Sequence, residues 1–340
     1  MLLLKFLKGY SILNTRSNLL HVTCFKILVT KCGGVFMKDV PKLKLDSEKV
    51  ALNKAKQLYE LLQMRDTMRI FINMFKGGVG KSTLTEILTF LINYYARILK
   101  EHENIDLNIL VIDVDPQGTL SKKLIKDLGI IQESNKTFMD ALKEGSFNDS
   151  ITKLTENVDI IKGDWEVANI ETWVRKNLKE DKEMYYLDFL IENLDKKYDL
   201  ILMDSIPTTS FYTNNCLMAS DFAIVPVKTD EDCYEQVLPY MSYLSTMREY
   251  NNKLDVIGMV PYLAQNDIDI DMNYLSKYRK EYGNLVYDNI VNWGKRVLAW
   301  STDGITTNIS NDKIQMRWYD DVLQETIVRA KKLLGDESNE

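Results

Sequence analysis

A glycine-rich segment, KGGVGKST at residues 76–83, constrains the fold of this chain more than any other feature, because it joins an apolar run to a helical stretch. Its three glycines permit backbone conformations that other residues avoid, and they bring successive N–H groups close to an anion. A helix expected to begin near Lys81 adds unpaired N–H donors and the positive end of its dipole. Lysines at positions 76 and 81 add charge. The segment therefore predicts a polyphosphate site at a strand–helix junction.

The polar residues of this segment have separate expected roles in holding a nucleotide. Lys81 is expected to contact the β and γ phosphates, Ser82 to ligate Mg²⁺ and Thr83 to approach the α phosphate. Phe75 occupies the place of the first glycine of the usual P-loop pattern and Lys76 follows it, so the motif is of the deviant Walker A type. The expected nucleotide-binding residues are Lys76, Gly77, Gly78, Val79, Gly80, Lys81, Ser82 and Thr83.

Acidic residues end two further apolar runs. Asp113 and Asp115, in IDVDPQG at 112–118, are two positions apart on a strand and therefore project from the same face. Asp204 follows four apolar residues in LILMD, which is the arrangement of a Walker B strand. Acids at strand ends can be simple turn residues, but beside a phosphate loop they are expected to manage Mg²⁺ and a water near the γ phosphate. Residues 205–208 form the expected switch loop.

Short apolar runs alternate with longer helical stretches along the chain. Runs that are apolar throughout indicate strands buried on both faces, hence a parallel sheet covered by helices. The predicted fold is α/β, a doubly wound, mostly parallel sheet flanked by helices, with ligand at the carboxyl ends of the strands. The expected strands are 68–75, 108–114, 158–162, 199–204, 222–227 and 254–260. The expected helices include 46–64, 81–99, 184–196, 231–249, 271–282 and 319–334.

Taken together, KGGVGKST, IDVDPQG and LILMDS resemble the motifs of the ParA/MinD superfamily of P-loop NTPases. The DPQG form followed by Thr119 is most similar to ParA, the ATPase that partitions plasmids and chromosomes, and the resemblance covers about residues 66–334. It implies an ATPase that uses ATP and Mg²⁺, forms an ATP-dependent sandwich homodimer and hydrolyses ATP slowly. The implied partners are non-specific DNA and a ParB-like centromere-binding protein that stimulates hydrolysis, which would make the protein cytoplasmic and nucleoid-associated.

The resemblance also implies roles for individual residues. Lys76 would reach across the two-fold interface to the partner's ATP, much as an arginine finger does. Asp115 would position the attacking water, with Asp113 supporting the magnesium and the loop geometry. Asp204 would hold a magnesium-bound water. The switch loop reads DSIPTTS where the family usually has Asp-Thr-Pro-Pro, so its hydrolysis-coupled movement is left open.

DNA binding by ParA dimers uses basic residues late in the chain. The candidates here are Lys295, Arg296, Arg317, Arg329, Lys331 and Lys332. Basic residues on terminal helices are often simply solvated, so both interpretations stay open. A genuine patch predicts DNA binding that falls steeply with salt.

Charge is distributed unevenly over the 340 residues. The net charge is −6, yet residues 1–36 carry five basic residues and no acid, which leaves −11 for residues 37–340. We interpret residues 1–36 as an extension, either weakly packed or translated from upstream DNA, because the GGV before Met37 is what a ribosome-binding site would encode. The expected divisions are then a basic N-terminal helix in 37–65, a ParA-like ATPase domain in 66–335 and an acidic tail in 336–340.

Alternative functions within the superfamily lack their expected sequence features. A MinD-like membrane-positioning ATPase would end in a basic amphipathic helix, whereas acids follow the last expected helix here and would be repelled by anionic lipid. An iron protein of the nitrogenase type would need cluster-binding cysteines, but Cys216 and Cys233 lack such motifs and are expected to be buried packing residues. A tyrosine-kinase relative would need a terminal tyrosine cluster, which the tail lacks. Partition is the preferred interpretation, with the MinD-like function as the alternative.

Overall fold

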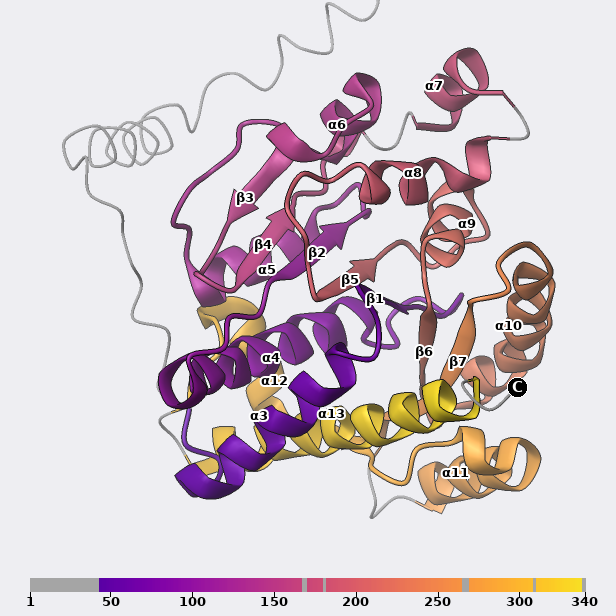
Figure 1. Ribbon diagram of the computed structural model, residues 1–340. Coiled ribbons are helices and arrows are strands. Elements are labelled where there is room, and N and C mark those ends of the chain that lie inside the picture. The colour runs from indigo at the N-terminus through magenta and orange to yellow at the C-terminus, as the bar shows by residue number, and fades with distance from the viewer. Residues whose placement is uncertain (1–42, 167–169, 180–181, 265–268, 308–309, 338–340) are drawn as a thin grey trace, which may run out of the picture. The chain divides into compact units, whose positions relative to one another are not determined.

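A computed structural model describes residues 43–166, 170–179, 182–264, 269–307 and 310–337 (Figure 1). The interpretation of residues 1–36, including a start at Met37, lies outside these residues. None of the helices in the described ranges is both long and apolar enough to cross a bilayer.

The strands of the described residues form one eight-stranded sheet in the order β3-β4-β2-β5-β1-β6-β7-β8. Paired strands are parallel, except for β3, which runs antiparallel to β4 at one edge. This arrangement confirms the predicted α/β fold. Strand β1 lies between β5 and β6, where the two halves of the sheet meet, and such a switch point opens a crevice at the carboxyl ends of the strands. The strands are β1 (Met68–Ile72), β2 (Ile109–Asp113), β3 (Ile151–Lys153), β4 (Val158–Ile161), β5 (Leu200–Asp204), β6 (Phe222–Val227), β7 (Asp255–Ala264) and β8 (Val291–Asn292).

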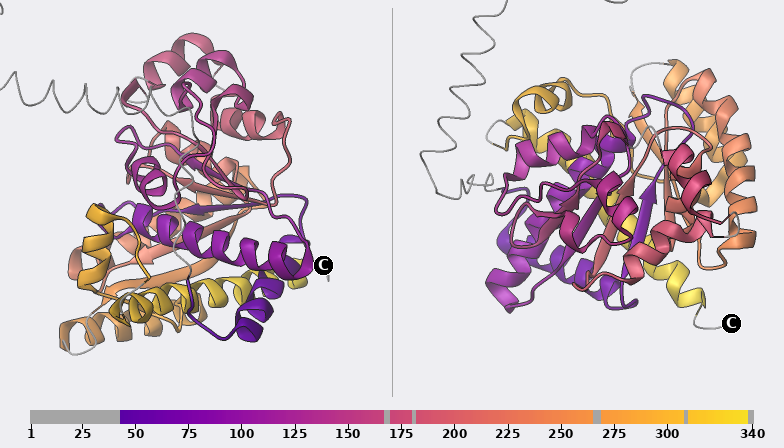
Figure 2. Two further views of the ribbon diagram at one scale, coloured as in Figure 1. Left: turned by 90° about the vertical axis from the view of Figure 1, so that its left-hand side faces the viewer. Right: turned by 90° about the horizontal axis from the view of Figure 1, so that it is seen from above.

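Helices cover both faces of this sheet. Figures 1 and 2 show α3, α4 and α13 gathered on one face, with α8 and α9 on the other. The α-helices are α3 (Glu48–Leu62), α4 (Lys81–Glu103), α5 (Thr119–Leu128), α6 (Phe138–Glu144), α7 (Ile170–Asn177), α8 (Tyr186–Glu192), α9 (Phe211–Met218), α10 (Glu231–Tyr250), α11 (Asp269–Tyr282), α12 (Lys295–Asp303) and α13 (Ser310–Glu337). The 3₁₀ helices are η1 (Asn148–Ser150), η3 (Glu183–Tyr185) and η4 (Gly283–Leu285).

Alternate residues of the central strands enter two separate cores. Leu200 and Leu202 of β5 pack in the core that includes α3, α4 and α13, whereas Ile201 and Met203 pack in the core that includes α8, α9 and α10. Because successive side chains of a strand point to opposite faces, a strand covered on both sides must be apolar at every position. The two-sided burial therefore explains the unbroken apolar runs of the sequence. Cys216 and Cys233 are free and buried, as expected for packing residues.

Some elements differ from the predicted ones. The edge strands β3 and β8 have only three and two residues, which is too short for a visible period in the sequence. The last helix, α13, begins at Ser310 instead of residue 319, because Met316 joins the core from a segment that is otherwise largely polar. It also continues through Gly335 to Glu337, where the sequence predicts a tail from residue 336. A glycine inside a helix costs only about 1 kcal/mol relative to alanine, so Gly335 does not end it.

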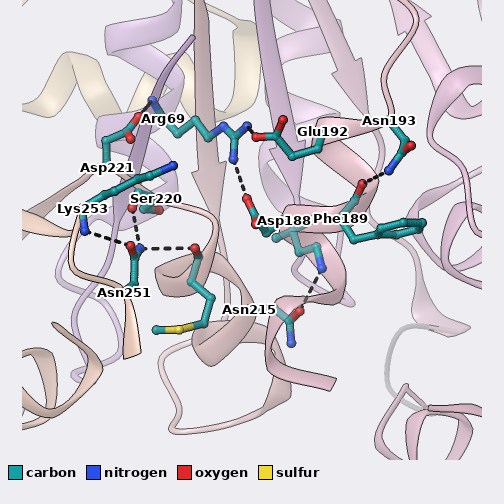
Figure 3. A network of polar contacts seen from close by, with 12 residues as sticks. Arg69, Asp188, Phe189, Glu192, Asn193, Asn215, Ser220, Asp221, Asn251 and Lys253 are labelled. Carbon is teal, nitrogen blue, oxygen red and sulfur yellow. Dashed lines mark hydrogen bonds and ion pairs between the residues drawn. The ribbon is translucent and has the colours of Figure 1, made fainter. Parts of the chain in front are cut away.

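A cavity of about 420 Å³ lies at the amino ends of the strands, opposite the phosphate loop. Figure 3 shows the polar contacts among the side chains that line it. Arg69 of β1 forms ion pairs with Asp188, at 2.6 Å, and with Glu192 of α8. Its backbone N–H donates to the Asp221 carboxylate at 2.8 Å, and Asn251 donates to the Ser220 carbonyl at 2.8 Å. The Arg69 contacts attach α8 and the amino end of β6 to the central strand β1. The Asn251 contact attaches the amino end of β7 to that of β6.

A largely buried ion-pair network attaches α3 to the rest of the α/β fold. Lys54 of α3 bonds the carboxylates of Asp46 and Asp320, both at 2.6 Å. Tyr95 of α4 donates its hydroxyl to Asp320 of α13, whose side chain is 0% exposed, whereas Lys54 is 17% exposed. The network therefore joins three helices around one buried carboxylate.

We expect Lys54→Met to lower the free energy of unfolding by about 3 kcal/mol, because it leaves the Asp320 charge buried without its cation. The magnitude lies at the lower end of the usual range, since Lys54 is partly exposed. Urea unfolding measures the change. Lys56→Met is the matched control, because Lys56 pairs with Glu103 at the surface, where such pairs contribute at most about 1 kcal/mol. Equal losses in the two variants would contradict the buried-pair interpretation.

Candidate functional site

The phosphate loop connects β1 to α4 at the carboxyl edge of the sheet. Gly78 and Gly80 have φ angles of 72° and 87°, which only glycine adopts readily. A Cβ atom on Gly80 would also lie 2.1 Å from the Tyr262 ring, so no larger residue fits there. Helix α4 begins at Lys81 without a side-chain cap, which leaves its first N–H groups available to an anion.

Lys81 lies between the loop and the acids of the neighbouring strands. Its side chain is buried, and its ammonium lies 3.5 Å from the Lys76 carbonyl oxygen. Burial lowers the pKa of Lys81, and the negative charges of Asp204 and Asp115 oppose that shift. Within the part of the chain that the structure describes, Lys81 forms no ion pair, so this buried cation is placed to accept the charge of a phosphate.

Asp113 organises the loop that follows β2. One of its oxygens accepts hydrogen bonds from the Ser121 N–H, at 2.8 Å, and from the Ser121 hydroxyl, at 2.7 Å. The other accepts from the Asp115 N–H at 3.1 Å. Burial raises the pKa of Asp113 to about 6, against the lowering effect of these hydrogen bonds. The contacts favour a role in loop geometry, because both oxygens already have donors within the chain.

Asp204 is the neighbour of Asp113 in strand register but has a different environment. Neither of its carboxylate oxygens has a hydrogen-bond partner among the described residues, and both are buried. Burial raises the pKa of Asp204 to about 8, and the charge of Asp113 adds to the shift, whereas the Ser82 and Lys81 side chains oppose it. An orphaned buried carboxylate beside a serine hydroxyl is the donor set expected for Mg²⁺.

A magnesium ion at this site would need ligands from the nucleotide as well as from the protein. Within the described ranges, no group of three or more His, Cys, Asp or Glu side chains could hold a metal alone. Magnesium commonly binds through one or two protein oxygens, several waters and substrate phosphates. Ser82 and Asp204 therefore fit a magnesium ion that arrives with a polyphosphate.

We expect Asp204→Asn to stabilise the metal-free protein at high pH. The pKa of Asp204 is about 8 in the folded chain and 3.8 ordinarily, so the folded chain holds a proton that the unfolded chain releases between these values. Stability in EDTA therefore falls as the pH rises through that interval. The variant should have a higher Tm than wild type at about pH 8, with the difference shrinking towards about pH 5.

Thermal unfolding in EDTA over this pH range tests the expectation. Asp195→Asn removes an exposed acid from the loop before β5 and should leave the pH profile unchanged. A constant Tm difference between Asp204→Asn and wild type across the pH range would contradict a buried titrating carboxylate.

Lys76 points away from the phosphate loop towards α10. Its ammonium bonds the Asp232 carboxylate at 2.8 Å, and the two side chains are 32% and 77% exposed. An exposed pair of this kind is weak, because water and salt screen it, so a phosphate can displace the carboxylate. The geometry leaves Lys76 free to move.

Two further loops close around the site. A Cβ atom on Gly163, which follows β4, would lie 2.5 Å from the Asp115 carbonyl oxygen, so that loop rests directly on the Asp113–Asp115 turn. The expected switch loop is also in place, because Pro207 lies 3.9 Å from the position of a Cβ atom on Gly77. The acid loop, the switch loop and the phosphate loop therefore meet at one edge of the sheet.

Four of the six DNA-binding candidates form ion pairs within the chain. Arg296 pairs with Asp312, Arg317 with Asp46, Arg329 with Glu325 and Lys331 with Glu60. Arg329 also stacks on the Tyr287 ring at 4.5 Å. Among the described residues, Lys295 of α12 and Lys332 of α13 are exposed with no ion pair.

Sequence reasoning missed several residues of the site. Five residues outside the predicted set contact its members: Ser121, Lys123, Gly163, Asp232 and Tyr262. No motif marks them, because each belongs to a segment that only folding brings to the site.

Comparison with known proteins agrees with this geometry. Residues 67–256 match the AAA domain family. The chain is 25% identical over 227 residues to the chromosome partitioning protein ParA of Caulobacter vibrioides, covering 65% of this chain and 79% of that protein. Its fold is similar to that of a plasmid partition protein of Borrelia burgdorferi bound to AMPPNP, with a TM-score of 0.59 and 21% identity; the match covers 77% of this chain and 98% of that chain.

A second similar structure is cobyrinic acid a,c-diamide synthase of Mycobacterium smegmatis with ADP and magnesium, with TM-score 0.58, 21% identity and coverage of 76% and 94%. At these identities the two structures show a shared fold. The family match spans more than half of the chain and includes the phosphate loop and both acidic strand ends. The chain therefore belongs to the AAA domain family, as a ParA-type P-loop ATPase.

Proposed function

We propose that this ATPase dimerises on binding ATP and Mg²⁺, associates with DNA without sequence preference in that state, and segregates a replicon with a centromere-binding partner that stimulates slow hydrolysis. The observation that carries the nucleotide part is the Asp204 carboxylate, which is buried beside Ser82 and the phosphate loop and has no hydrogen-bond partner of good geometry among the described residues. The similarity to the chromosome partitioning protein ParA of Caulobacter vibrioides supports the segregation part.

The chain's own residues would divide the work of hydrolysis. The loop N–H groups and Lys81 bind the β and γ phosphates and orient the nucleotide. Bound magnesium, held through Ser82 and a water on Asp204, would neutralise charge on the phosphates. Asp115, held by the contacts of Asp113, would orient the attacking water.

A pocket of about 280 Å³ is the proposed site of the adenine base. It adjoins the phosphate loop, because Leu263 in its wall follows Tyr262, whose ring contacts Gly80. Trp293 in the same wall is 41% exposed and offers a ring on which a base can stack. The remaining lining residues are Lys228, Thr229, Asp230 and Asp271.

The exposed pair between Lys76 and Asp232 supports the dimer. A lysine that only served the nucleotide of its own chain would lie over the loop, whereas Lys76 lies at its rim, 32% exposed. We propose that, when two chains bind ATP, the Lys76 ammonium leaves Asp232 and contacts the phosphates bound to the partner chain. The exchange is inexpensive, because surface ion pairs are weak.

DNA association is the part with the least support from side-chain geometry. Four of the candidate residues are engaged in ion pairs within the chain, so Lys295 and Lys332 are the preferred contacts among the six. An acidic chain would need dimerisation to bring such residues together, which would make DNA binding depend on ATP.

The test is DNA binding by purified protein with ATP, with ADP and without nucleotide, over a salt series. We expect unrelated duplexes to bind equally, only with ATP, and with an affinity that falls linearly on a log–log plot against salt. Lys76→Ala should bind ATP but fail to bind DNA. Nucleotide-independent binding, or binding to anionic vesicles in place of DNA, would contradict the partition function, and the vesicle result would favour the MinD-like alternative.

A further inference from the structure

Lys123 of α5 reaches across to the first turns of α4. Its ammonium bonds the Thr83 hydroxyl oxygen at 2.9 Å and the Glu86 carboxylate at 2.6 Å. The side chains of Lys123 and Glu86 are 15% and 3% exposed, so the contact is largely withdrawn from water. Helix α5 follows the acid loop directly, and α4 begins at the phosphate loop. The contact thus joins the two halves of the site.

The chemistry of the contact fixes the direction of the Thr83 hydroxyl. An ammonium has three donors and no acceptor, so the Thr83 oxygen must accept the bond from Lys123. The hydroxyl keeps its own proton for a different acceptor. In the same helix, Thr85 and Thr89 donate their hydroxyls to the carbonyls of Lys81 and Thr85. The described residues show no such bond for Thr83.

The Thr83 hydroxyl lies in the first turn of α4, next to the expected phosphate site. Thr83 is the third residue of α4, one residue after the proposed magnesium ligand Ser82. The α phosphate is the acceptor that a bound nucleotide offers at this turn, beyond the β and γ phosphates held by the loop. A hydroxyl polarised by an ammonium is a stronger donor than a free one, because the bonds of a chain reinforce one another.

Glu86 keeps Lys123 in this role. A lone buried lysine near phosphates would turn towards them, whereas Glu86 balances its charge and holds the ammonium on the Thr83 oxygen. The Glu86 carboxylate is itself buried and needs this partner. The three side chains therefore form one unit: acid, ammonium and hydroxyl.

We infer that Lys123 is a positioning residue for the nucleotide, which turns the Thr83 hydroxyl so that it donates its proton to the α phosphate. This inference rests on the proposed binding of ATP. It assigns Lys123 a role that the motifs of the chain do not contain, because the residue lies outside KGGVGKST, IDVDPQG and LILMDS.

The test is the dissociation constant, by titration calorimetry with Mg²⁺, for ADP and for the Rp and Sp forms of ADP with sulfur on the α phosphate. Wild type should prefer one form, since sulfur is a poor acceptor for the Thr83 proton. Lys123→Met and Thr83→Val should each weaken ADP binding about tenfold, the usual effect of losing a bond to a charged group, and abolish the preference. The double variant should lose no more than either single variant.

Controls separate this role from a merely structural link between α4 and α5. Lys122→Met removes the neighbouring lysine, which bonds the Gln117 carbonyl, and should keep the affinity and the preference. Lys123→Arg keeps a donor and should restore both. Lys123→Met combined with Glu86→Met removes both charges of the buried pair, which protects the fold, and should show the same loss as Lys123→Met.

The outcomes distinguish the inference from the proposed function. Wild-type affinity and sulfur preference in Lys123→Met would overturn the inference while leaving ATP binding intact. Losses that multiply in the double variant would also overturn it, because the two residues would then act independently. Absence of nucleotide binding by wild type would overturn the proposed function and the inference with it.

Discussion

Lys81→Ala is expected to abolish ATP hydrolysis and to weaken ATP binding by about 100-fold or more. The Lys81 ammonium is buried at the start of α4, where it bonds the Lys76 carbonyl at 3.5 Å and forms no ion pair with the carboxylates of the described residues. Charge-assisted hydrogen bonds contribute about 1.5–3 kcal/mol each, and two phosphates would bond to this one group. Losing both bonds would raise the dissociation constant for ATP about 100-fold or more. Calorimetry and phosphate release measure the two effects.

Two lysines provide the comparison. Lys100→Ala removes a lysine from the last turn of the same helix, where it pairs with Asp106 at the surface, and should change neither measurement. Lys76→Ala should keep ATP binding within about threefold while turnover and dimerisation fall, since its pair with Asp232 is weak. Unchanged ATP affinity in Lys81→Ala would place the nucleotide elsewhere on the protein.

Asp115→Ala is expected to lower the hydrolysis rate about 100-fold or more while ATP affinity stays within a few-fold of wild type. A positioned carboxylate that orients a water contributes about 100-fold or more to such a reaction. Asp115 is half-buried at the turn after β2, where its carboxylate accepts the Gln117 N–H at 2.8 Å. Single-turnover hydrolysis and equilibrium binding separate the two effects, and the variant should accumulate as an ATP-bound dimer.

Asp113→Asn is the matched comparison on the same strand. Its single amide oxygen can keep the two bonds from Ser121, whereas its NH2 group then faces the Asp115 N–H and that bond is lost. We therefore expect the turn to loosen, but hydrolysis to fall less than in Asp115→Ala. Asp106→Ala, an exposed acid before β2, should be silent. Equal losses in Asp113→Asn and Asp115→Ala would indicate that loop geometry, and not a water held by Asp115, controls the rate.

Much of the fold was predictable, because its signals are local. Apolar runs such as 200–203 must be strands buried on two sides, and the long helices show their period over several turns. The short elements were not predictable: β8 has two residues, and α12 exposes Leu298 and buries Trp300, so neither offers a clear pattern. Their conformation depends on the packing of the neighbouring sheet edge and of α13.

The sequence by itself determined the chemistry that is carried by neighbours along the chain: glycines and lysines around a helix start, and acids at the ends of apolar strands. Only the tertiary structure decided which polar groups meet between distant segments. It gave Asp113 its donors at Ser121 and placed Lys123 on Thr83 and Lys76 on Asp232. Among the described residues it left the Asp204 carboxylate without a hydrogen-bond donor of good geometry. The physical reason is that burial sets the energy of a polar group, and burial depends on how the chain packs and not on the order of its residues.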